Sequence, residues 1–316
     1  MFTETIHILG ATDDRYSPWY GVMLTSLFEN NKRERIIVHM LTGGLQAENE
    51  SALHQLANRY GQALHFVYVD ESALAKCPIR VNDHVTLSTW FRLLAPVLLP
   101  DSIDKVLYLD GDIIVNGPIK ALWNTDIKDY AIGAAIDESY WNSEIYDRLI
   151  IDKQIPYTSA GVLLINLAYW RNKKGVERCF SCIEKMADKL LFHDQDTVNV
   201  VFQKEKRLLP ITYNLQYGFI RKWSFSACDN TVQQEILSTI HNPVIIHYSG
   251  PGKPWFRFND NPYRKFFLKY KRLSLWNNTK LQYVYSLSDI LRDFAGRIAR
   301  AIRLKEALYI INSQEL

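Results

Sequence analysis

Hydrophobic positions along the first half of the chain form two alternating patterns. Short apolar runs that are typical of strands occupy residues 4–11, 35–41, 63–69, 105–110, 130–136 and 160–167. Helical spacing fills residues 17–31 and 47–61, and the first of these helices is expected to begin with Ser17 as N-cap and Pro18 as its first residue. Strands alternating with helices of this length predict βαβ units and a mainly parallel sheet. Several strands are apolar on both faces, as expected when helices cover both sides.

Two carboxylates, Asp110 and Asp112, lie at the end of the apolar run that begins at residue 105. In an extended chain residues i and i+2 point the same way, so Asp110 and Asp112 can reach one point, with Gly111 between them. Paired carboxylates repel unless a cation joins them, and a hard divalent ion there keeps open positions for phosphate oxygens. A strand-ending turn with two solvated acids is the alternative. An EF-hand loop is excluded, because Ile114 occupies its next ligand position.

A second polar segment, VIIHYSGPGKPW, runs from residue 244 to residue 255. His247 ends an apolar run and is followed by Gly250, Gly252 and Lys253. Glycines let backbone N–H groups approach an anion, and the ammonium supplies charge. An imidazole beside two carboxylates favours Mn²⁺ over Mg²⁺. Taken alone, His247 fits a buried core histidine equally well.

A third polar segment, FHDQDTVNVVF at residues 192–202, opens a helical pattern. Its Asp194, Gln195 and Asp196 either cap this helix or reach a site. In parallel sheets ligands bind outside the carboxyl ends of the strands, which is where the carboxylates after residue 109 are expected to lie.

Composition and charge add a distinct C-terminal region. The chain has 316 residues, 47% hydrophobic and 22% charged, which is enough apolar material for one large domain. Residues 264–305 carry eleven Lys or Arg against two acids, about +9, although the net charge of the chain is +3. With apolar residues at helical spacing, residues 286–311 are predicted to form a basic amphipathic helix for an anionic membrane surface. A helix packed on the main domain is the alternative.

The cysteines and the N-terminus suggest an ordinary reduced protein. Cys179 and Cys182 form a CxxC inside a helical pattern, and without two more ligands at a familiar spacing a zinc or redox role is not favoured. The N-terminus lacks the basic and apolar regions of a signal peptide, and no apolar run has the length of a membrane span. We therefore expect a cytoplasmic protein.

Seven motifs resemble one known family, and they occur in its order over about the first 260 residues. They are ATDDRYSPW (11–19), TWFRLLAP (89–96), KVLYLDGDIIV (105–115), IGAAIDES (132–139), SAGVLLINLAYW (159–170), HDQDTVN (193–199) and HYSGPGKPW (247–255). The sequence thus resembles glycosyltransferase family 8, retaining enzymes that use nucleotide-sugar donors, and in particular its bacterial lipopolysaccharide galactosyl- and glucosyltransferases. The resemblance implies an α/β fold of GT-A type, Rossmann-like, with a catalytic domain at 1–260 and a basic, membrane-associating helical tail at 261–316.

The resemblance also implies roles for individual residues. Asp110, Asp112 and His247 are expected to hold Mn²⁺, with Mg²⁺ as the other choice. Gln195 is expected to face the anomeric carbon, and Asp194 to bond a hydroxyl of the transferred sugar or act as nucleophile. The expected donor-binding residues are Ala11, Asp13, Arg92, Asp137, Ser159, Gly250 and Lys253. Ser159 stands where the family commonly has Asn, so glucose and galactose both stay open as the transferred sugar. Arg15 also stands where relatives often have Asn, and this departure bears on the contact with the ribose.

The function expected from the resemblance is Mn²⁺-dependent transfer of a hexose from a UDP-sugar to lipopolysaccharide or another cell-surface glycan, a lipid-linked acceptor at the inner face of the cytoplasmic membrane. A sugar nucleotidyltransferase is disfavoured, because such enzymes usually carry a Gly-rich basic loop where this chain has the acidic ATDDRYSPWY. A non-catalytic glycan- or membrane-binding module has no need of Asp110, Asp112, His247 and Lys253 together. Nucleic acid is not an expected partner, since only the basic tail supports it.

Overall fold

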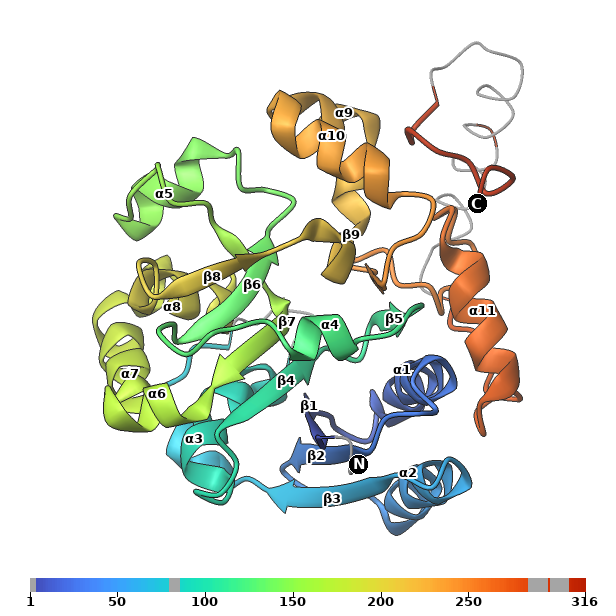
Figure 1. The fold of residues 1–316 in the computed structure, drawn as a ribbon, viewed down its shortest axis with the longest axis horizontal. Helices are drawn as coiled ribbons and strands as arrows, with labels where there is room; N and C mark the ends of the chain where they lie inside the picture. Colours follow the sequence, from blue (N-terminus) through green and yellow to red (C-terminus); the bar gives the residue numbers. More distant parts are fainter. Residues whose placement is uncertain (1–3, 80–85, 284–294, 296–306) are drawn as a thin grey trace.

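The computed structural model describes residues 4–79, 86–283, 295 and 307–316. Within these residues a seven-stranded sheet forms the centre, in the order β3-β2-β1-β4-β7-β6-β8 (Figure 1). Its strands are β1 (Ile6–Ala11), β2 (Ile36–Thr42), β3 (Ala63–Tyr68), β4 (Lys105–Leu109), β6 (Ile132–Ile136), β7 (Thr158–Asn166) and β8 (Lys206–Leu209). Only β7 runs antiparallel to its two neighbours, so the predicted mainly parallel α/β fold is confirmed.

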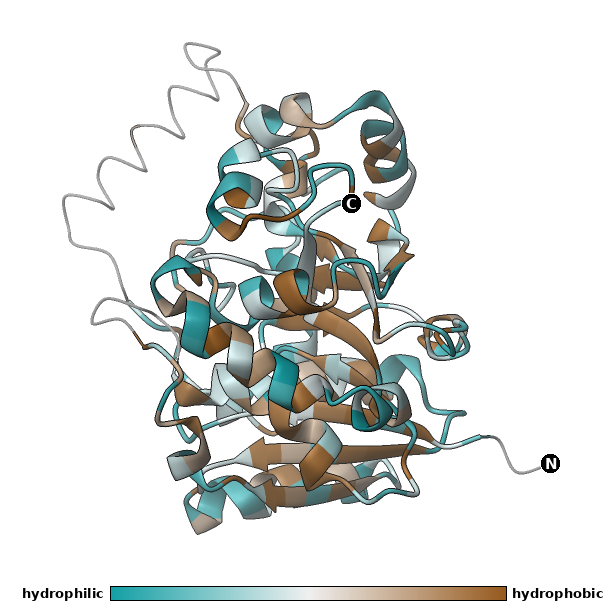
Figure 2. Ribbon diagram, turned by 90° about the vertical axis from the view of Figure 1, so that its left-hand side faces the viewer, coloured by the Kyte–Doolittle hydropathy of each residue, from teal (hydrophilic) through white to brown (hydrophobic). Residues whose placement is uncertain are grey.

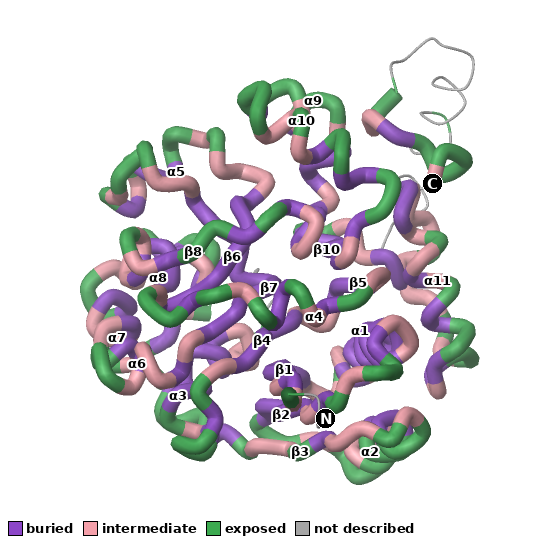
Figure 3. The backbone as a smooth tube through the Cα atoms, viewed as in Figure 1, coloured by how far each residue is buried: buried purple, intermediate pink, exposed green. Residues whose placement is uncertain are grey.

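Helices cover both faces of this sheet, as the two-sided apolar strands predict. One face packs against α1 (Ser17–Asn30), α2 (Ala47–Arg59) and α4 (Lys120–Trp123). The other packs against η2 (Leu87–Leu94), α3 (Ala95–Leu98), α6 (Leu167–Asn172), α7 (Gly175–Met186) and α8 (His193–Val201), with α5 (Ser143–Leu149) beside them. The central strands and α1 are buried, whereas α2 and α5 turn exposed residues outward (Figure 3). Hydrophilic residues lie mainly on the outside of the molecule (Figure 2).

The two helices predicted from spacing are α1 and α2, but the expected cap of the first is wrong. Tyr16 is the N-cap, and Ser17 is already the first helical residue. The cause is Asp13, whose side chain accepts the Tyr16 N–H at 2.8 Å while its carbonyl accepts the Ser17 N–H at 2.9 Å. The CxxC lies inside α7 as expected, with both thiols buried and free, and burial raises the pKa of Cys182 to about 11.

A second sheet of three strands lies beside the first, in the order β5-β10-β9. Its strands are β5 (Ile113–Val115), β9 (Leu215–Gln216) and β10 (Ile245–His247). It packs into a separate hydrophobic cluster with η4 (Ile211–Tyr213), η5 (Tyr217–Ile220), α9 (Lys222–Ala227), α10 (Asn230–Thr239) and α11 (Arg264–Leu273). The turn 110–112 is therefore the direct connection between the last residue of β4 and the first residue of β5.

The end of the chain returns to this second sheet. The Ile310 N–H donates to Ile220 O at 2.9 Å, the Lys222 N–H donates to Leu308 O at 3.0 Å, and Ile311 is buried. Of the predicted basic helix at 286–311, the structure describes residue 295 and residues 307–311. Residues 307–311 are not helical, because their backbone bonds Ile220 and Lys222 instead, so the predicted end of the helix is wrong. The rest of that helix lies outside the described residues, and it and the boundary at 260 stay predictions. In the part of the chain that is described, no helix combines the length and the apolar character that crossing a bilayer requires.

A candidate active site between the two sheets

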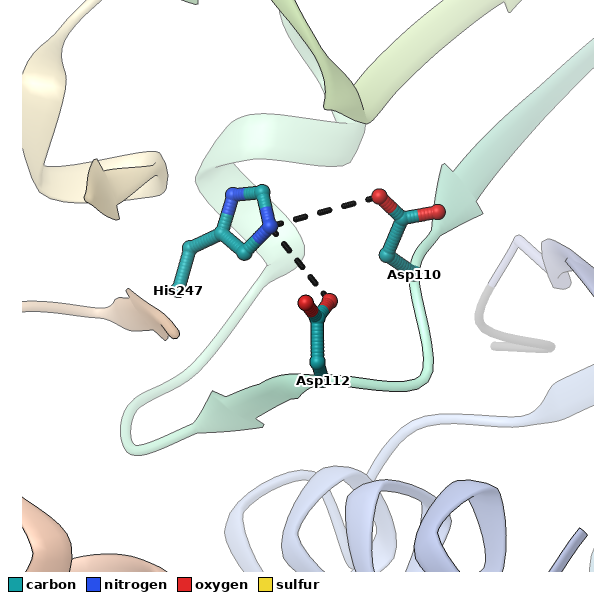
Figure 4. A group of neighbouring side chains, drawn as sticks. All are labelled: Asp110, Asp112 and His247. Atoms are coloured by element: carbon teal, nitrogen blue, oxygen red, sulfur yellow. Dashed lines mark ion pairs between the residues drawn. The ribbon is translucent and has the colours of Figure 1, made fainter. Parts of the chain in front are cut away.

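Asp110, Asp112 and His247 come together at the end of β4 (Figure 4). His247 Nε2 lies 3.4 Å from Asp112 Oδ1 and 4.0 Å from Asp110 Oδ2. One ligand atom from each residue lies within 4.8 Å of the other two. The two carboxylates converge through a turn and not, as the sequence pattern suggested, along an extended strand.

The register of β5 against β10 places the histidine. Ile113, the residue after Asp112, pairs with His247, and the Tyr248 N–H donates to Asp112 O at 3.0 Å. His247 Nδ1 lies 2.9 Å from Asn214 Oδ1. This contact fixes the ring, so that Nε2 faces the carboxylates.

Gly161 on β7 keeps the point of convergence open. A Cβ there would lie 2.3 Å from His247 Cε1 and 2.9 Å from Asp110 Oδ2. The Asp110 N–H also donates to Gly161 O at 2.9 Å, which holds the two chains at this spacing. Two carboxylates and one imidazole around a space that any side chain would fill are a donor set that fits Mn²⁺ or Mg²⁺.

Lys253 completes the charge of this group. Its ammonium pairs with Asp112 and donates to Tyr248 O at 3.1 Å. Burial disfavours the Asp112 carboxylate, but the charges of Lys253 and His247 outweigh burial and hold the pKa of Asp112 well below its usual range. Gly250, three residues earlier, has φ of 73°, which favours glycine.

Arg92 links this group to Asp194. The guanidinium is buried over the Tyr108 ring, 3.0 Å from Asp110 Oδ1 and 2.9 Å from Asp194 Oδ2. Thr89 donates to the other Asp194 oxygen at 3.2 Å. Burial raises the pKa of Asp194 to about 6 although Arg92 acts to lower it. Asp194 Oδ1 thus accepts a hydrogen bond, whereas Oδ2 is buried beside Arg92 as an ion pair without a hydrogen bond among the described residues.

Gln195 and Asp137 form the next layer of the site. Gln195 Oε1 accepts the Ala160 N–H at 2.9 Å, and its Nε2 donates to Asp137 Oδ2 at 3.2 Å. Gln216 Nε2 donates to the same Asp137 oxygen at 3.0 Å. Ser159 is buried and its Oγ accepts the Gly161 N–H at 3.3 Å, so it faces its own strand.

Gln216 was missed by sequence reasoning. It belongs to the two-residue strand β9, which carries no periodic signal of its own, and it pairs with His247 in the second sheet. Only the pairing with the HYSGPGKPW segment connects it to the site.

Ala11 and Asp13 lie at another edge of the site. Asp13 lines a cavity of about 510 Å³ together with Thr12, Gly43 and other residues beyond the carboxyl ends of β1, β2 and β3. Its Oδ2 accepts from Thr86 at 3.1 Å. Ala11 is the last residue of β1 and is partly exposed. The cavity has the size usual for small-molecule sites.

Tyr16 is a second residue that sequence reasoning missed, although it lies inside a quoted motif. A Cβ at Gly111 would come within 3.2 Å of its ring, which therefore packs against the carboxylate turn. Burial and the charges of Asp112, Asp110 and Asp13 raise the pKa of Tyr16 well above its usual value, so the phenol stays neutral. The ring also meets Trp255 edge to face at 5.3 Å.

Asp196 lies outside the site. Its carboxylate accepts from Arg148 at 2.7 Å, from the Tyr157 hydroxyl at 2.6 Å and from the Phe192 N–H at 2.7 Å, and it is fully buried. The polar residues of the 192–202 segment were expected either to cap the helix or to reach a site, and the structure shows that they differ. Asp196 holds the start of α8, whereas Asp194 and Gln195 face the site.

Comparisons with known proteins agree with this geometry. The family model "Glycosyl transferase family 8" matches residues 7–259. General stress protein A of Bacillus subtilis (strain 168) is 27% identical over 278 residues, 87% of this chain and 96% of that protein. A lipopolysaccharide 1,2-glucosyltransferase of Escherichia coli is 28% identical over 278 residues, covering 87% and 80%. The structure of galactosyltransferase LgtC with donor and acceptor sugar analogs matches with a TM-score of 0.78 at 27% identity, covering 85% and 96%.

Proposed function

Because the chain belongs to glycosyl transferase family 8 and is thus a sugar-transferring enzyme, we propose that it moves glucose or galactose from a UDP-sugar to lipopolysaccharide or another cell-surface glycan, with retention of configuration. The similarity to a lipopolysaccharide glucosyltransferase and to galactosyltransferase LgtC supports both the hexose and the acceptor class. The observation that carries the proposal is the opening at Gly161, where three ligands and a lysine converge.

In this proposal the metal-binding residues act on the leaving group, UDP. Breaking the sugar–phosphate bond puts negative charge on UDP, and a divalent ion held by Asp110, Asp112 and His247 supplies Lewis-acid stabilisation of that charge. Mn²⁺ is the expected ion, since the set includes an imidazole. The ammonium of Lys253 lies within the same group and adds a point charge for the pyrophosphate. Gly250 lets the backbone of its loop approach the phosphates.

The sugar lies next to Asp137 and Gln195 in this proposal. Asp137 and Asp194 bond hydroxyls of the sugar, with Arg92 and Ser159 beside them, and Gln195 faces the anomeric carbon. Retention through two displacements needs a carboxylate free to attack that carbon. Since Asp194 is buried, with one oxygen ion-paired to Arg92 and the other accepting from Thr89, we favour attack by the acceptor on the face that UDP leaves, with a UDP oxygen taking the proton.

The nucleoside is assigned to the cavity beyond β1. Ala11 and Asp13 hold the uracil and ribose, and the 510 Å³ cavity that Asp13 lines supports this placement. The neutral ring of Tyr16, three residues after Asp13 and packed against the carboxylate turn, is the proposed stacking surface for the base.

Residues 261–316 are proposed to attach the enzyme to the inner face of the cytoplasmic membrane. The support is the charge of about +9 over residues 264–305, because basic residues near an anionic surface add about 1 kcal/mol each. The full chain should sediment with anionic liposomes, not with neutral ones, and binding should weaken as salt rises. Equal sedimentation with both liposomes would contradict the electrostatic attachment.

The catalytic proposal is tested by UDP release. UDP-glucose and UDP-galactose are incubated with the enzyme, with and without Mn²⁺, and Asp112→Asn serves as the variant of a metal ligand. Release from one donor that depends on Mn²⁺ and falls by at least about tenfold in the variant is the expected result. No release from either donor would overturn the proposed hexose transfer, and equal release by the variant at saturating Mn²⁺ would overturn the metal assignment.

A further inference from the structure

Two of the eight tryptophans are exposed, and they touch each other. Trp141 is 37% and Trp223 60% exposed, whereas the other six, all within the described part, are buried. The two rings lie 6.0 Å apart at an interplanar angle of 86°. Trp141 precedes α5 and Trp223 lies in α9, so two segments that are distant in the sequence bring the rings together. Single exposed hydrophobic side chains are common, but a contiguous apolar patch at the surface often marks a binding site, and these two rings are contiguous.

The pair is held in place by one backbone carbonyl. Trp141 Nε1 donates to Glu138 O at 3.0 Å, and Ser224, the neighbour of Trp223, donates its hydroxyl to the same oxygen at 3.4 Å. The polar atom of the Trp141 indole is therefore satisfied within the protein. What the pair offers to solvent is its apolar ring surface, in a fixed arrangement.

Glu138 connects this pair to the sugar side of the active site. Its backbone N–H donates to Gln216 Oε1 at 2.8 Å, and its carboxylate accepts from the Ser249 hydroxyl at 3.0 Å. Glu138 directly follows Asp137, and Trp141 comes four residues after Asp137. Four residues span at most about 14 Å, so exposed Trp141 lies within that distance of buried Asp137.

We propose that Trp141 and Trp223 form an acceptor subsite that binds a pyranose ring of the glycan through its apolar C–H face. Aromatic rings bury large area at little entropic cost, and the perpendicular pair presents a face and an edge as a corner. The carboxylate of Asp229, which already accepts from the Tyr140 hydroxyl at 2.7 Å, and the exposed Lys222 provide polar partners for hydroxyls nearby. The inference rests on the proposed function, because it places the acceptor beside the donor sugar.

The test separates acceptor binding from donor chemistry. Trp223→Ala, Trp141→Ala and Trp223→Phe are compared with wild type, and Tyr68→Ala is the control, an exposed aromatic on β3. UDP release is measured without acceptor and with maltotriose, cellotriose and a deacylated lipopolysaccharide core oligosaccharide, and binding of the three saccharides is measured by saturation-transfer NMR. Each Ala variant should raise the acceptor KM about tenfold more than it changes acceptor-free release. Trp223→Phe should recover most of the loss, and Tyr68→Ala should change neither quantity.

Three outcomes would overturn the subsite. They are an unchanged acceptor KM in both Ala variants, an equal loss of acceptor-free release and acceptor-dependent rate, which indicates a structural role, and no saturable binding of any saccharide to wild type. A wild type that releases no UDP from either donor would instead fail the proposed function, so the two failures are distinguishable.

Discussion

Gly161→Ala is the sharpest test of the metal site, because it replaces none of the proposed ligands and acts only on their positions. The new Cβ would lie 2.3 Å from His247 Cε1, more than 1 Å inside the ordinary contact limit of 3.4 Å, and 2.9 Å from Asp110 Oδ2. Neither neighbour can yield easily. His247 is held by Asn214 and by the β10 register, and Asp110 by Arg92 and the Tyr108 hydroxyl. The imidazole must therefore leave its place opposite the carboxylates.

The expected loss of Mn²⁺ affinity follows from displacing one of three ligands. Overpacking costs about 1–3 kcal/mol of stability, and disturbing even an outer-shell partner of a metal costs about 10–100-fold in affinity, so we expect a loss of at least about 100-fold. At a Mn²⁺ concentration of 100 times the wild-type Kd, the ion should stabilise wild type by about 2.7 kcal/mol and the variant by only about 0.4 kcal/mol.

Thermal unfolding with and without Mn²⁺ measures this difference, together with Mn²⁺ titration of UDP release. Gly117→Ala is the matched control, since its Cβ would meet nothing closer than 3.5 Å. The control should keep the full rise of Tm with Mn²⁺. If Gly161→Ala keeps that rise as well, and releases UDP at the wild-type rate, the ion does not bind between Asp110, Asp112 and His247.

Three further predictions concern single charges. Lys253→Ala should lower kcat by about tenfold or more while raising the donor KM less, because its charge acts on the leaving group; a pure KM effect in steady-state kinetics would contradict this. Burial and the neighbouring His7 lower the pKa of His39 to about 4. The neutral His39 therefore stabilises the fold above pH 6.5, and this contribution to the free energy of unfolding should be lost as pH falls from 6.5 towards 4. In urea unfolding, His39→Gln should show a smaller decrease of the free energy of unfolding over this range. Burial likewise lowers the pKa of Lys206 to about 7, so wild-type stability should rise between pH 7 and 10.5, and Lys206→Met should raise Tm at pH 7 and remove that rise; an unchanged profile would refute it.

Local patterns sufficed for much of the fold. Strands β1 to β4, the helices α1 and α2 and the helical start of the HDQD segment follow from the hydrophobic pattern of the sequence, the strands as short apolar runs and the helices as longer stretches with helical spacing of apolar residues. The same holds for Asp110 and Asp112, which stand at the end of a buried strand. These features depend on residues close together in the sequence.

What the sequence left open depends on long-range pairing. His247 reaches Asp112 only through the antiparallel register of β5 and β10, and Gln216 reaches Asp137 from a strand of two residues. The placement of Tyr16 depends on the turn that Asp13 caps, and this turn also displaced the expected cap from Ser17. None of these contacts leaves a periodic trace in the chain, so no pattern of spacing predicts them.

The return of the chain end fixes both flanks of the segment 284–306 to the protein. One end is fixed where the Gln282 N–H donates to Trp255 O at 2.9 Å, and the other where Ile310 bonds Ile220. Closing a longer loop costs little extra entropy, so the enclosed stretch tolerates changes of length far better than loss of either anchor. Cutting the chain after Leu281 would remove both attachment points together with the buried Ile311. A membrane test should therefore replace the interior of this segment with a Gly/Ser linker and keep both ends. If this segment binds a bilayer, it would connect the membrane to the protein at two points, one beside Trp255 and one beside α9.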